Sequence, residues 1–274
     1  MHPQPGPTVS VPYRSTTRVI AHRGASGTYA EHTLAAYKLA IEQGADGLEC
    51  DVRLTADGHL VCVHDRTVNR TSNGRGVVST LELAQLSELD FGGWKAGDIE
   101  ETDWTSADHT SVLTLERLLE LHADAGRHIE LAIETKHPTR YAGLVEKRLM
   151  ELLGRFGLVP SKGEGPSPVR VMSFSQLSLR RIRQMAPELP TVFLMERVLP
   201  WLRDGSLPHG ARIAGPGIDV IRANPGYVAA LHRAGQRVHV WTVDEPEDVE
   251  LCLRLGVEAI ITNHPRRVLD QLGR

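Results

Sequence analysis

Short apolar segments of strand length alternate with longer amphipathic segments over most of the chain. The apolar segments occupy residues 19–21, 48–54, 60–64, 129–134, 169–174, 191–195, 238–242 and 259–262. Apolar residues at helical spacing lie between most of them, for example over residues 33–43, 115–125, 144–156, 177–185 and 225–234. Eight strands that alternate with helices over this length predict an α/β fold, the (β/α)8 TIM barrel. No glycine-rich dinucleotide or phosphate-binding loop follows any of these strands, which argues against a doubly wound sheet.

Two stretches depart from this alternation. Residues 1–18 contain proline, serine and threonine without a continuous apolar core, so we expect a flexible tail rather than a signal peptide. Residues 66–111 are rich in glycine, threonine, serine and aspartate, and they are too many for an ordinary loop. The prediction is therefore a single TIM-barrel domain over residues 19–274, with residues 66–111 inserted as a small subdomain after the third strand.

The composition excludes several classes of function. A formal net charge of -3 and an aromatic content of 5% offer neither a basic surface nor a stacking platform for nucleic acid. No window has the length and apolar character that a membrane span needs. Cys50, Cys62 and Cys252 are sparse and odd in number, which argues against a disulfide framework. We therefore expect a cytoplasmic protein with a small-molecule substrate.

Polar side chains gather at the ends of the predicted strands. Active sites of TIM barrels lie at the carboxyl ends of the strands, so these positions are the candidates for chemistry. They are His22, Arg23, Glu49, Asp51, His64, Glu134, Lys136 and Trp241. Because residues two apart on a strand face the same way, Glu49 and Asp51 should point together, and Glu134 and Lys136 likewise.

Carboxylates aimed together into a barrel repel each other and lose hydration. A divalent cation bound by Glu49, Asp51 and Glu134 removes this difficulty, and ligands that are all oxygen favour Mg²⁺, Ca²⁺ or Mn²⁺ over zinc. Arg23 and Lys136 could instead neutralise the carboxylates without a metal. The pattern leaves both explanations open.

His22 and His64 are candidates for proton transfer, because imidazole titrates near neutral pH. Arg23 and Lys136 supply positive charge that suits a phosphate group. Trp241 could wall a pocket or simply pack in the core. The other histidines, including His59, His109, His128 and His209, lack such neighbours and are expected on the surface.

Taken together, these motifs resemble the bacterial type of the glycerophosphodiester phosphodiesterase family. The resemblance rests on the segments His22-Arg23-Gly24-Ala25, Glu31-His32-Thr33, Glu49-Cys50-Asp51-Val52, Asp57-Gly58, His64-Asp65, Ile133-Glu134-Thr135-Lys136, Ser173-Phe174-Ser175, Val240-Trp241-Thr242-Val243 and Ile260-Ile261-Thr262-Asn263. Each segment alone is weakly specific, whereas the combination is highly specific and spans nearly the whole chain.

The resemblance implies a TIM barrel with a small insertion and a divalent metal at Glu49, Asp51 and Glu134. It also implies His22 and His64 as acid and base, with Arg23 and Lys136 near the phosphate and Glu31 supporting the edge of the site. The sequence departs from the family pattern at His32, where asparagine is common, and at Thr135, where an apolar residue is usual. The first departure puts the hydrogen bonding around Glu31 in doubt.

The expected reaction is hydrolysis of a glycerophosphodiester, such as glycerophosphocholine or glycerophosphoethanolamine, to glycerol 3-phosphate and an alcohol. Either histidine could be the base, and the nucleophile could be the glycerol 2-hydroxyl or water. Two alternatives are a lysophospholipase D-like phosphodiesterase on the same scaffold and a non-catalytic phosphate-ester binding protein. The first needs an apolar rim on the insertion, where only Phe91, Trp94 and Trp104 are large apolar candidates. The second is expected to lack a proton donor or a metal ligand, and none is missing.

Overall fold

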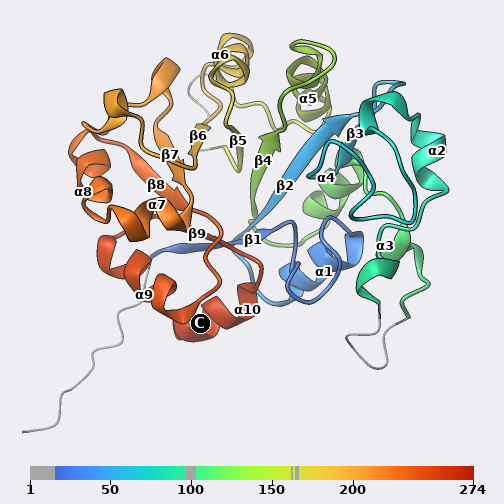
Figure 1. Cartoon of the computed structure of the whole chain (residues 1–274), viewed down its shortest axis with the longest axis horizontal. Coiled ribbons are helices and arrows are strands. Elements are labelled where there is room, and N and C mark those ends of the chain that lie inside the picture. Colours follow the sequence, from blue (N-terminus) through green and yellow to red (C-terminus); the bar gives the residue numbers. More distant parts are fainter. Residues whose placement is uncertain (1–15, 97–102, 162, 164–166) are drawn as a thin grey trace, which may run out of the picture.

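Eight parallel strands form a closed barrel in the computed structural model, which describes residues 16–96, 103–161, 163 and 167–274 (Figure 1). The strands are β1 (Arg18–His22), β2 (Gly47–Leu54), β4 (Glu130–Thr135), β5 (Val169–Ser173), β6 (Thr191–Met195), β7 (Ile213–Pro216), β8 (Arg237–Val240) and β9 (Ala259–Thr262). They are hydrogen-bonded in this order, and β1 pairs with both β2 and β9, which closes the barrel. The predicted TIM barrel is confirmed. Most of the expected tail, residues 1–15, lies outside the described residues.

The number of barrel strands was predicted correctly because two errors cancelled. The predicted third strand, β3 (Leu60–Cys62), is antiparallel to β2 and lies outside the parallel barrel. Only residues 55–59 separate it from β2, whereas a parallel connection needs a dozen residues or more. The missed strand is β7, whose four residues end in Gly215-Pro216 and therefore have the composition of a turn.

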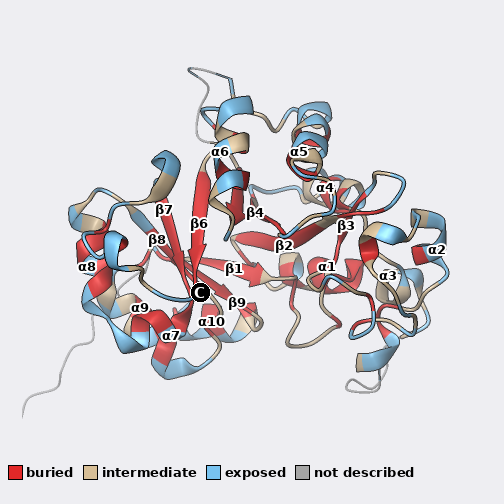
Figure 2. Cartoon of the chain, turned by 45° about the horizontal axis from the view of Figure 1, so that its top comes forward, coloured by how far each residue is buried: buried red, intermediate tan, exposed pale blue. Residues whose placement is uncertain are grey.

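Helices pack around the barrel and bury one face each against it (Figure 2). They are α1 (Leu34–Glu42), α4 (Leu115–Ala123), α5 (Leu144–Arg155), α6 (Gln176–Met185), α7 (Ile218–Ala223), α8 (Gly226–Arg233), α9 (Pro246–Leu255) and α10 (Pro265–Gln271). Thr33 caps α1 by accepting a hydrogen bond from the Ala36 N–H, and Thr114 caps α4 in the same way. Among the described residues no helix is long and apolar enough to cross a membrane.

An apolar cluster fills part of the barrel interior below the polar strand ends. Ile20, Ala132, Met172, Val192, Leu194, Ile213, Ala259 and Ile261 form this cluster. His22 and Glu134 lie two residues beyond Ile20 and Ala132 on the same strands, so they share the inward face and lie nearer the mouth. The alternation along each strand therefore places an apolar floor beneath a polar site.

The described residues between β3 and α4 form four short helices, and several of them share a hydrophobic cluster with β3. The helices are η1 (Val78–Thr80), α2 (Leu83–Ser87), η2 (Gly93–Lys95) and α3 (Ala107–Thr110). The cluster consists of Val61, Val63, Val68, Val78, Leu86 and Phe91. Val61 and Val63 precede residue 66, so the cluster includes β3 and the residue that follows it as well as the predicted insertion.

Candidate active site

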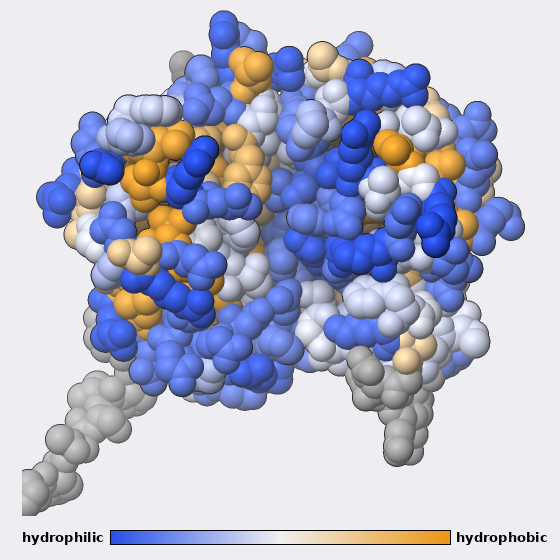
Figure 3. Space-filling model, in the orientation of Figure 1, coloured by the Kyte–Doolittle hydropathy of each residue, from blue (hydrophilic) through white to orange (hydrophobic). Residues whose placement is uncertain are grey.

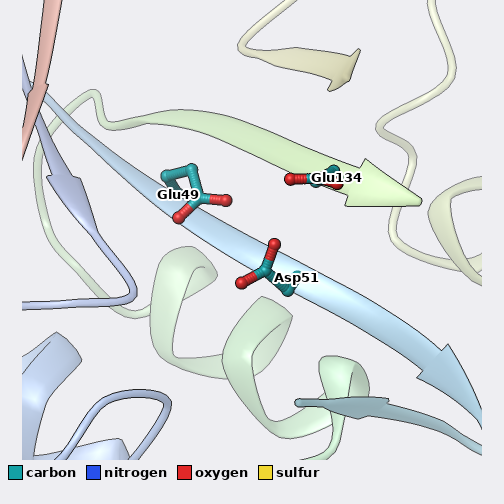
Figure 4. Close-up of side chains that lie close together, drawn as sticks. All are labelled: Glu49, Asp51 and Glu134. Atoms are coloured by element: carbon teal, nitrogen blue, oxygen red, sulfur yellow. The ribbon is translucent and has the colours of Figure 1, made fainter. Parts of the chain in front are cut away.

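Three carboxylates converge inside the mouth of the barrel. Glu49 and Asp51 extend from β2 and Glu134 from β4, and Asp51 is paired in register with Glu134 (Figure 4). One oxygen atom of each carboxylate lies within 4.8 Å of the others, and all three residues are buried. The predicted common face of Glu49 and Asp51 is confirmed.

Two cations contact this cluster. Arg23 Nε lies 2.9 Å from Asp51 Oδ2, and Lys136 Nζ lies 2.8 Å from Glu134 Oε1 and 3.3 Å from Asp51 Oδ1. Two cations cannot balance three carboxylates, and Asp51 Oδ1 is buried without a hydrogen-bond partner. Burial and the Asp51 charge raise the pKa of Glu49 well above its ordinary value and raise that of Glu134 to about 8. The excess negative charge and the all-oxygen donor set fit a divalent cation.

The imidazole of His22 is oriented by a hydrogen-bond network at the end of β9. Its Nδ1 lies 2.7 Å from Asn263 Oδ1, while Asn263 Nδ2 donates to Asp244 Oδ2 at 2.6 Å. Because the Asp244 carboxylate only accepts, the Asn263 amide oxygen must face His22, and His22 Nδ1 carries the proton. His22 Nε2 is left as an acceptor 3.9 Å from Glu49 Oε2. Burial and the Arg23 charge lower the pKa of His22 to about 4, which agrees with a neutral ring.

His64 is held in a similar way by residues of the segment that follows β3. Its Nδ1 lies 2.8 Å from Asp65 Oδ1, and Asp65 in turn accepts from Arg70 Nε at 2.9 Å. The hydrogen bonds from Arg70 lower the pKa of Asp65, so the carboxylate is charged and His64 Nδ1 donates to it. The Arg53 guanidinium also donates to the backbone oxygen of His64 at 2.7 and 3.0 Å. His64 Nε2 is thus left as the second acceptor.

Glu31 lies at the edge of the site between two arginines. Its Oε1 accepts from Arg23 Nη1 at 3.0 Å and from Arg70 Nη2 at 2.8 Å, and its Oε2 accepts from Arg70 Nη1 at 2.8 Å. These bonds outweigh burial and lower the pKa of Glu31 to about 2. Arg23 has a φ of 57° and is followed by Gly24 at 84°, so the chain turns sharply after β1 and directs Arg23 back over the cluster.

The two departures from the family pattern have different surroundings. His32 Nε2 lies 3.0 Å from Asp51 Oδ2 and its Nδ1 lies 2.9 Å from Tyr37 Oη, so His32 supports a carboxylate of the cluster. Thr135 instead pairs its hydroxyl with Ser178 at 2.7 Å on the helix side of the barrel. His32 therefore bears on the site more directly than its sequence position indicated.

A cavity of about 260 Å³ lies at the candidate site, and both histidines and two of the three carboxylates line it. Its lining comprises His22, Arg23, Glu49, His64, Glu134, Lys136, Met172, Phe174, Leu194, Glu196 and Trp241. Trp241 lines the cavity and also packs on the interior apolar cluster, and its Nε1 donates to Gly215 O at 2.7 Å. Phe174 meets the Trp241 ring edge-on, with 5.5 Å between ring centroids. Both interpretations of Trp241 thus describe part of its environment.

Several residues of the site were not predicted from the sequence. Asn263, Asp244, Asp65, Arg70 and Arg53 orient the two histidines or Glu31, yet none of them was assigned a role. Asn263 directly follows β9, so the rule that functional groups lie at strand ends would have found it. Arg70 lies 39 residues from Glu31 within the insertion, and no local pattern reveals that pairing.

The prediction that the remaining histidines lie on the surface is correct for some and wrong for others, since His32 is buried beside Asp51 and His239 is buried beside Arg170. His59, His128 and His209 are exposed. His109 is half-buried and lies against Tyr29 and Trp104, with ring centroids 4.6 and 5.2 Å away. The surface prediction is therefore wrong for His109, because an aromatic contact between the insertion and the loop after β1 covers it.

Comparison with known proteins gives the family. The model of the glycerophosphoryl diester phosphodiesterase family matches residues 22–267. A probable glycerophosphodiester phosphodiesterase 1 of Mycobacterium tuberculosis is 48% identical over 249 residues, which cover 91% of this chain and 90% of that protein. A glycerophosphodiester phosphodiesterase of Bacillus subtilis is 36% identical over 248 residues, which cover 90% and 83%.

Solved structures show the same fold. A putative glycerophosphoryl diester phosphodiesterase of Silicibacter pomeroyi superposes with a TM-score of 0.76 at 26% identity, over 94% of this chain and 93% of that one. A phosphodiesterase of Oleispira antarctica, solved in complex with the product sn-glycerol-3-phosphate, gives a TM-score of 0.77 at 23% identity, over 94% and 97%. With the family model matched over most of its length, the chain belongs to the glycerophosphoryl diester phosphodiesterase family, as the sequence motifs predicted.

Proposed function

We propose that the protein hydrolyses glycerophosphodiesters to glycerol 3-phosphate and an alcohol, with His22 and His64 as the acid-base pair. The observation that carries this proposal is the geometry of the two imidazoles. Each has Nδ1 held by an oxygen acceptor and Nε2 left free, and both line one cavity with the carboxylate cluster. The names of the relatives from Mycobacterium tuberculosis and Bacillus subtilis support the same reaction.

The proposal includes one divalent cation, Mg²⁺, Ca²⁺ or Mn²⁺, held by Glu49, Asp51 and Glu134. When bound, it supplies positive charge that offsets the negative charge of the phosphoryl oxygens. Arg23 and Lys136 add fixed positive charge on either side of the same cluster, which favours a phosphate over a neutral ester. Glu31 holds Arg23 in this position.

The histidines move the protons. A neutral imidazole with a free Nε2 can accept the proton of an attacking hydroxyl, and the second imidazole, once protonated, donates to the leaving oxygen. Asn263 and Asp65 keep the correct tautomer at His22 and His64 through their bonds to Nδ1. The attacking hydroxyl is either the 2-hydroxyl of the substrate's glycerol, which gives a cyclic phosphate that water then opens to glycerol 3-phosphate, or water itself.

The described insertion offers little apolar surface for a lipid substrate. Phe91 is buried in its small core, and Trp104 packs edge-on against Tyr29 at 5.7 Å between ring centroids. Trp94 is 47% exposed and its indole N–H donates to the Phe91 carbonyl. These three aromatic residues therefore do not form the continuous apolar rim that the lysophospholipase D-like alternative needs on the insertion.

The test is a coupled assay for glycerol 3-phosphate with a panel of glycerophosphodiesters. His22→Ala and His64→Ala should each lower kcat about 10²–10⁴-fold, the usual effect of losing a positioned acid or base. His128→Ala, at an exposed site, is the matched control and should behave as wild type. Near-normal turnover by either active-site variant would contradict its assigned role.

A further inference from the structure

A second cavity, of about 410 Å³, lies beside the candidate active site. It is formed by the end of β2, residues 77–80 of the insertion and the connection from β4 to α5. Its lining comprises Arg53, Leu54, Arg66, Val77, Val78, Ser79, Thr80, Lys136, Pro138, Thr139, Arg140, Tyr141 and Val145. Lys136 lines both cavities, so the second begins where the first ends.

The lining contains four cations and no carboxylate. Lys136 is paired with Glu134, but Arg53, Arg66 and Arg140 have no ion pair with any carboxylate of the described residues. Arg66 and Arg140 are exposed at the rim, and Arg140 lies over the Tyr141 ring at 5.5 Å. By contrast, Arg23 and Arg70 of the neighbouring site are both bound to Glu31. The rim of the second cavity therefore carries two positive charges, Arg66 and Arg140, that no ion pair of the described residues balances.

Arg53 lines the second cavity and also contacts His64 of the candidate active site. Arg53 follows Asp51 by two residues on β2, so it shares the face of the carboxylates and lies nearer the mouth. Its guanidinium already donates to the backbone oxygen of His64. A substrate whose phosphate lies between His22 and His64 can therefore extend one of its two alcohol groups past Arg53 into the second cavity.

The floor of the cavity is apolar, with Leu54, Val78 and Val145 among its lining residues. Low polarity strengthens the attraction between an anion and the surrounding arginines. The same charges repel a quaternary ammonium group, and Tyr141 alone is not the aromatic cage that such groups favour. Guanidinium groups match phosphate oxygens in both charge and shape.

We propose that the second cavity receives the leaving alcohol and selects alcohols that carry a further phosphate or phosphodiester group. The inference rests on the proposed hydrolysis of glycerophosphodiesters and names the substrate class within it. Glycerophosphodiesters with a second phosphate are then better substrates than those that release choline or ethanolamine.

The test compares three substrates: bis(glycerophospho)glycerol, whose leaving group bears a second phosphodiester, glycerophosphoglycerol, whose leaving group is neutral, and glycerophosphocholine. We expect kcat/KM to decrease in that order. In the double variant Arg66→Ala/Arg140→Ala, the ratio of kcat/KM between the first and second substrates should fall about tenfold, as expected when two partly exposed charge pairs are lost. Arg233→Ala, an exposed arginine at the end of α8, is the control and should leave the ratio unchanged.

Two outcomes would overturn the proposal: a ratio that the double variant leaves unchanged, or a preference for glycerophosphocholine or for an alkyl alcohol. Turnover of glycerophosphoglycerol reports on the proposed function by itself, so the two failures are distinguishable. Calorimetric titration of the His22→Ala protein with bis(glycerophospho)glycerol measures the subsite without turnover. Its affinity should fall about tenfold when Arg66→Ala/Arg140→Ala is added, and an unchanged affinity would refute the subsite.

Discussion

Asn263 offers a sharp test of the candidate site, because it acts on His22 without touching the carboxylate cluster in the described structure. Its Oδ1 accepts from His22 Nδ1 at 2.7 Å and from Ser26 Oγ at 2.8 Å. Asp244 holds the other end of the amide through Asn263 Nδ2 and the Asn263 backbone N–H. Asn263→Ala removes the acceptor and leaves His22 free to rotate and to change tautomer.

The size of the effect follows from the lost hydrogen bond. A buried donor that loses its partner destabilises its arrangement by about 1–3 kcal/mol. At roughly 1.4 kcal/mol for each factor of ten, kcat should fall about 10- to 100-fold. The loss should be smaller than for His22→Ala, because the imidazole is still present. KM should change little, since Asn263 does not line the cavity.

The measurement is steady-state kinetics in the glycerol 3-phosphate assay, with thermal unfolding to confirm that the variant is folded. Asn224→Ala, at an exposed position after α7, is the matched control. A fall in kcat at constant KM identifies Asn263 as a positioning residue. If Asn263→Ala turned over at the wild-type rate, His22 would not depend on this contact, and the assigned tautomer would be wrong.

Four further predictions address the metal, the nucleophile, the insertion and the dependence on pH. Chelation should abolish turnover, and Mg²⁺, Ca²⁺ or Mn²⁺ should restore it. Glu49→Gln should both weaken metal binding, measured by titration, and lower the rate. Full activity of the metal-stripped enzyme would exclude the proposed cofactor. A glycerophosphocholine analogue without the 2-hydroxyl should lose far more in kcat than in affinity, because a tethered nucleophile gains several kcal/mol from positioning; a normal kcat would indicate attack by water. Replacing residues 66–111 by a short linker should change the order in which the substrates of the panel are preferred, because loops at this face of the barrel determine specificity. An unchanged order in a folded variant would refute a role of the insertion in substrate choice. Glu146 is buried, which by itself would raise its pKa, but the contact with His137 helps to lower that pKa to about 2. The charged carboxylate therefore contributes to the free energy of unfolding above the ordinary pKa of 4.5, and this contribution should be lost as the pH falls towards 2. The full difference is on the order of 3 kcal/mol, and denaturant unfolding between pH 5 and pH 2.5 should show a steeper loss for wild type than for Glu146→Gln.

The parts of the site that were predictable from the sequence follow from geometry within a single strand. Alternation on β2 places Glu49 and Asp51 on one face, and the same rule places His22 directly above Ile20. The hairpin of β2 and β3 was equally accessible, because five residues leave no room for a crossover helix. Strand β7 was not accessible in this way, since Gly215 and Pro216 break the apolar pattern that identifies a strand.

Two of the pairings that orient the candidate residues could not be predicted, because they depend on how distant parts of the chain come together. His22 and Asn263 are 241 residues apart and meet only because β9 pairs with β1. Arg70 reaches Glu31 only because the insertion folds back over the loop after β1. Residue types at strand ends therefore indicate the candidate groups, whereas the tautomer of His22 depends on a contact between the ends of the first and last strands.

Arg70 of the insertion contributes a positive charge to the edge of the candidate site, which the composition of the insertion does not reveal. Arg23 contacts Asp51 with Nε and Glu31 with Nη1, so its charge is divided between the carboxylate cluster and the edge of the site. Arg70, from the insertion, neutralises Glu31 with two hydrogen bonds and binds Asp65 beside His64. Because Arg70 shares the Glu31 carboxylate, Arg23 is not the only cation that balances its charge, and Arg70 also holds the Asp65 partner of His64. Both contacts depend on the insertion being folded, so the insertion supports the proposed catalytic groups as well as bordering the second cavity.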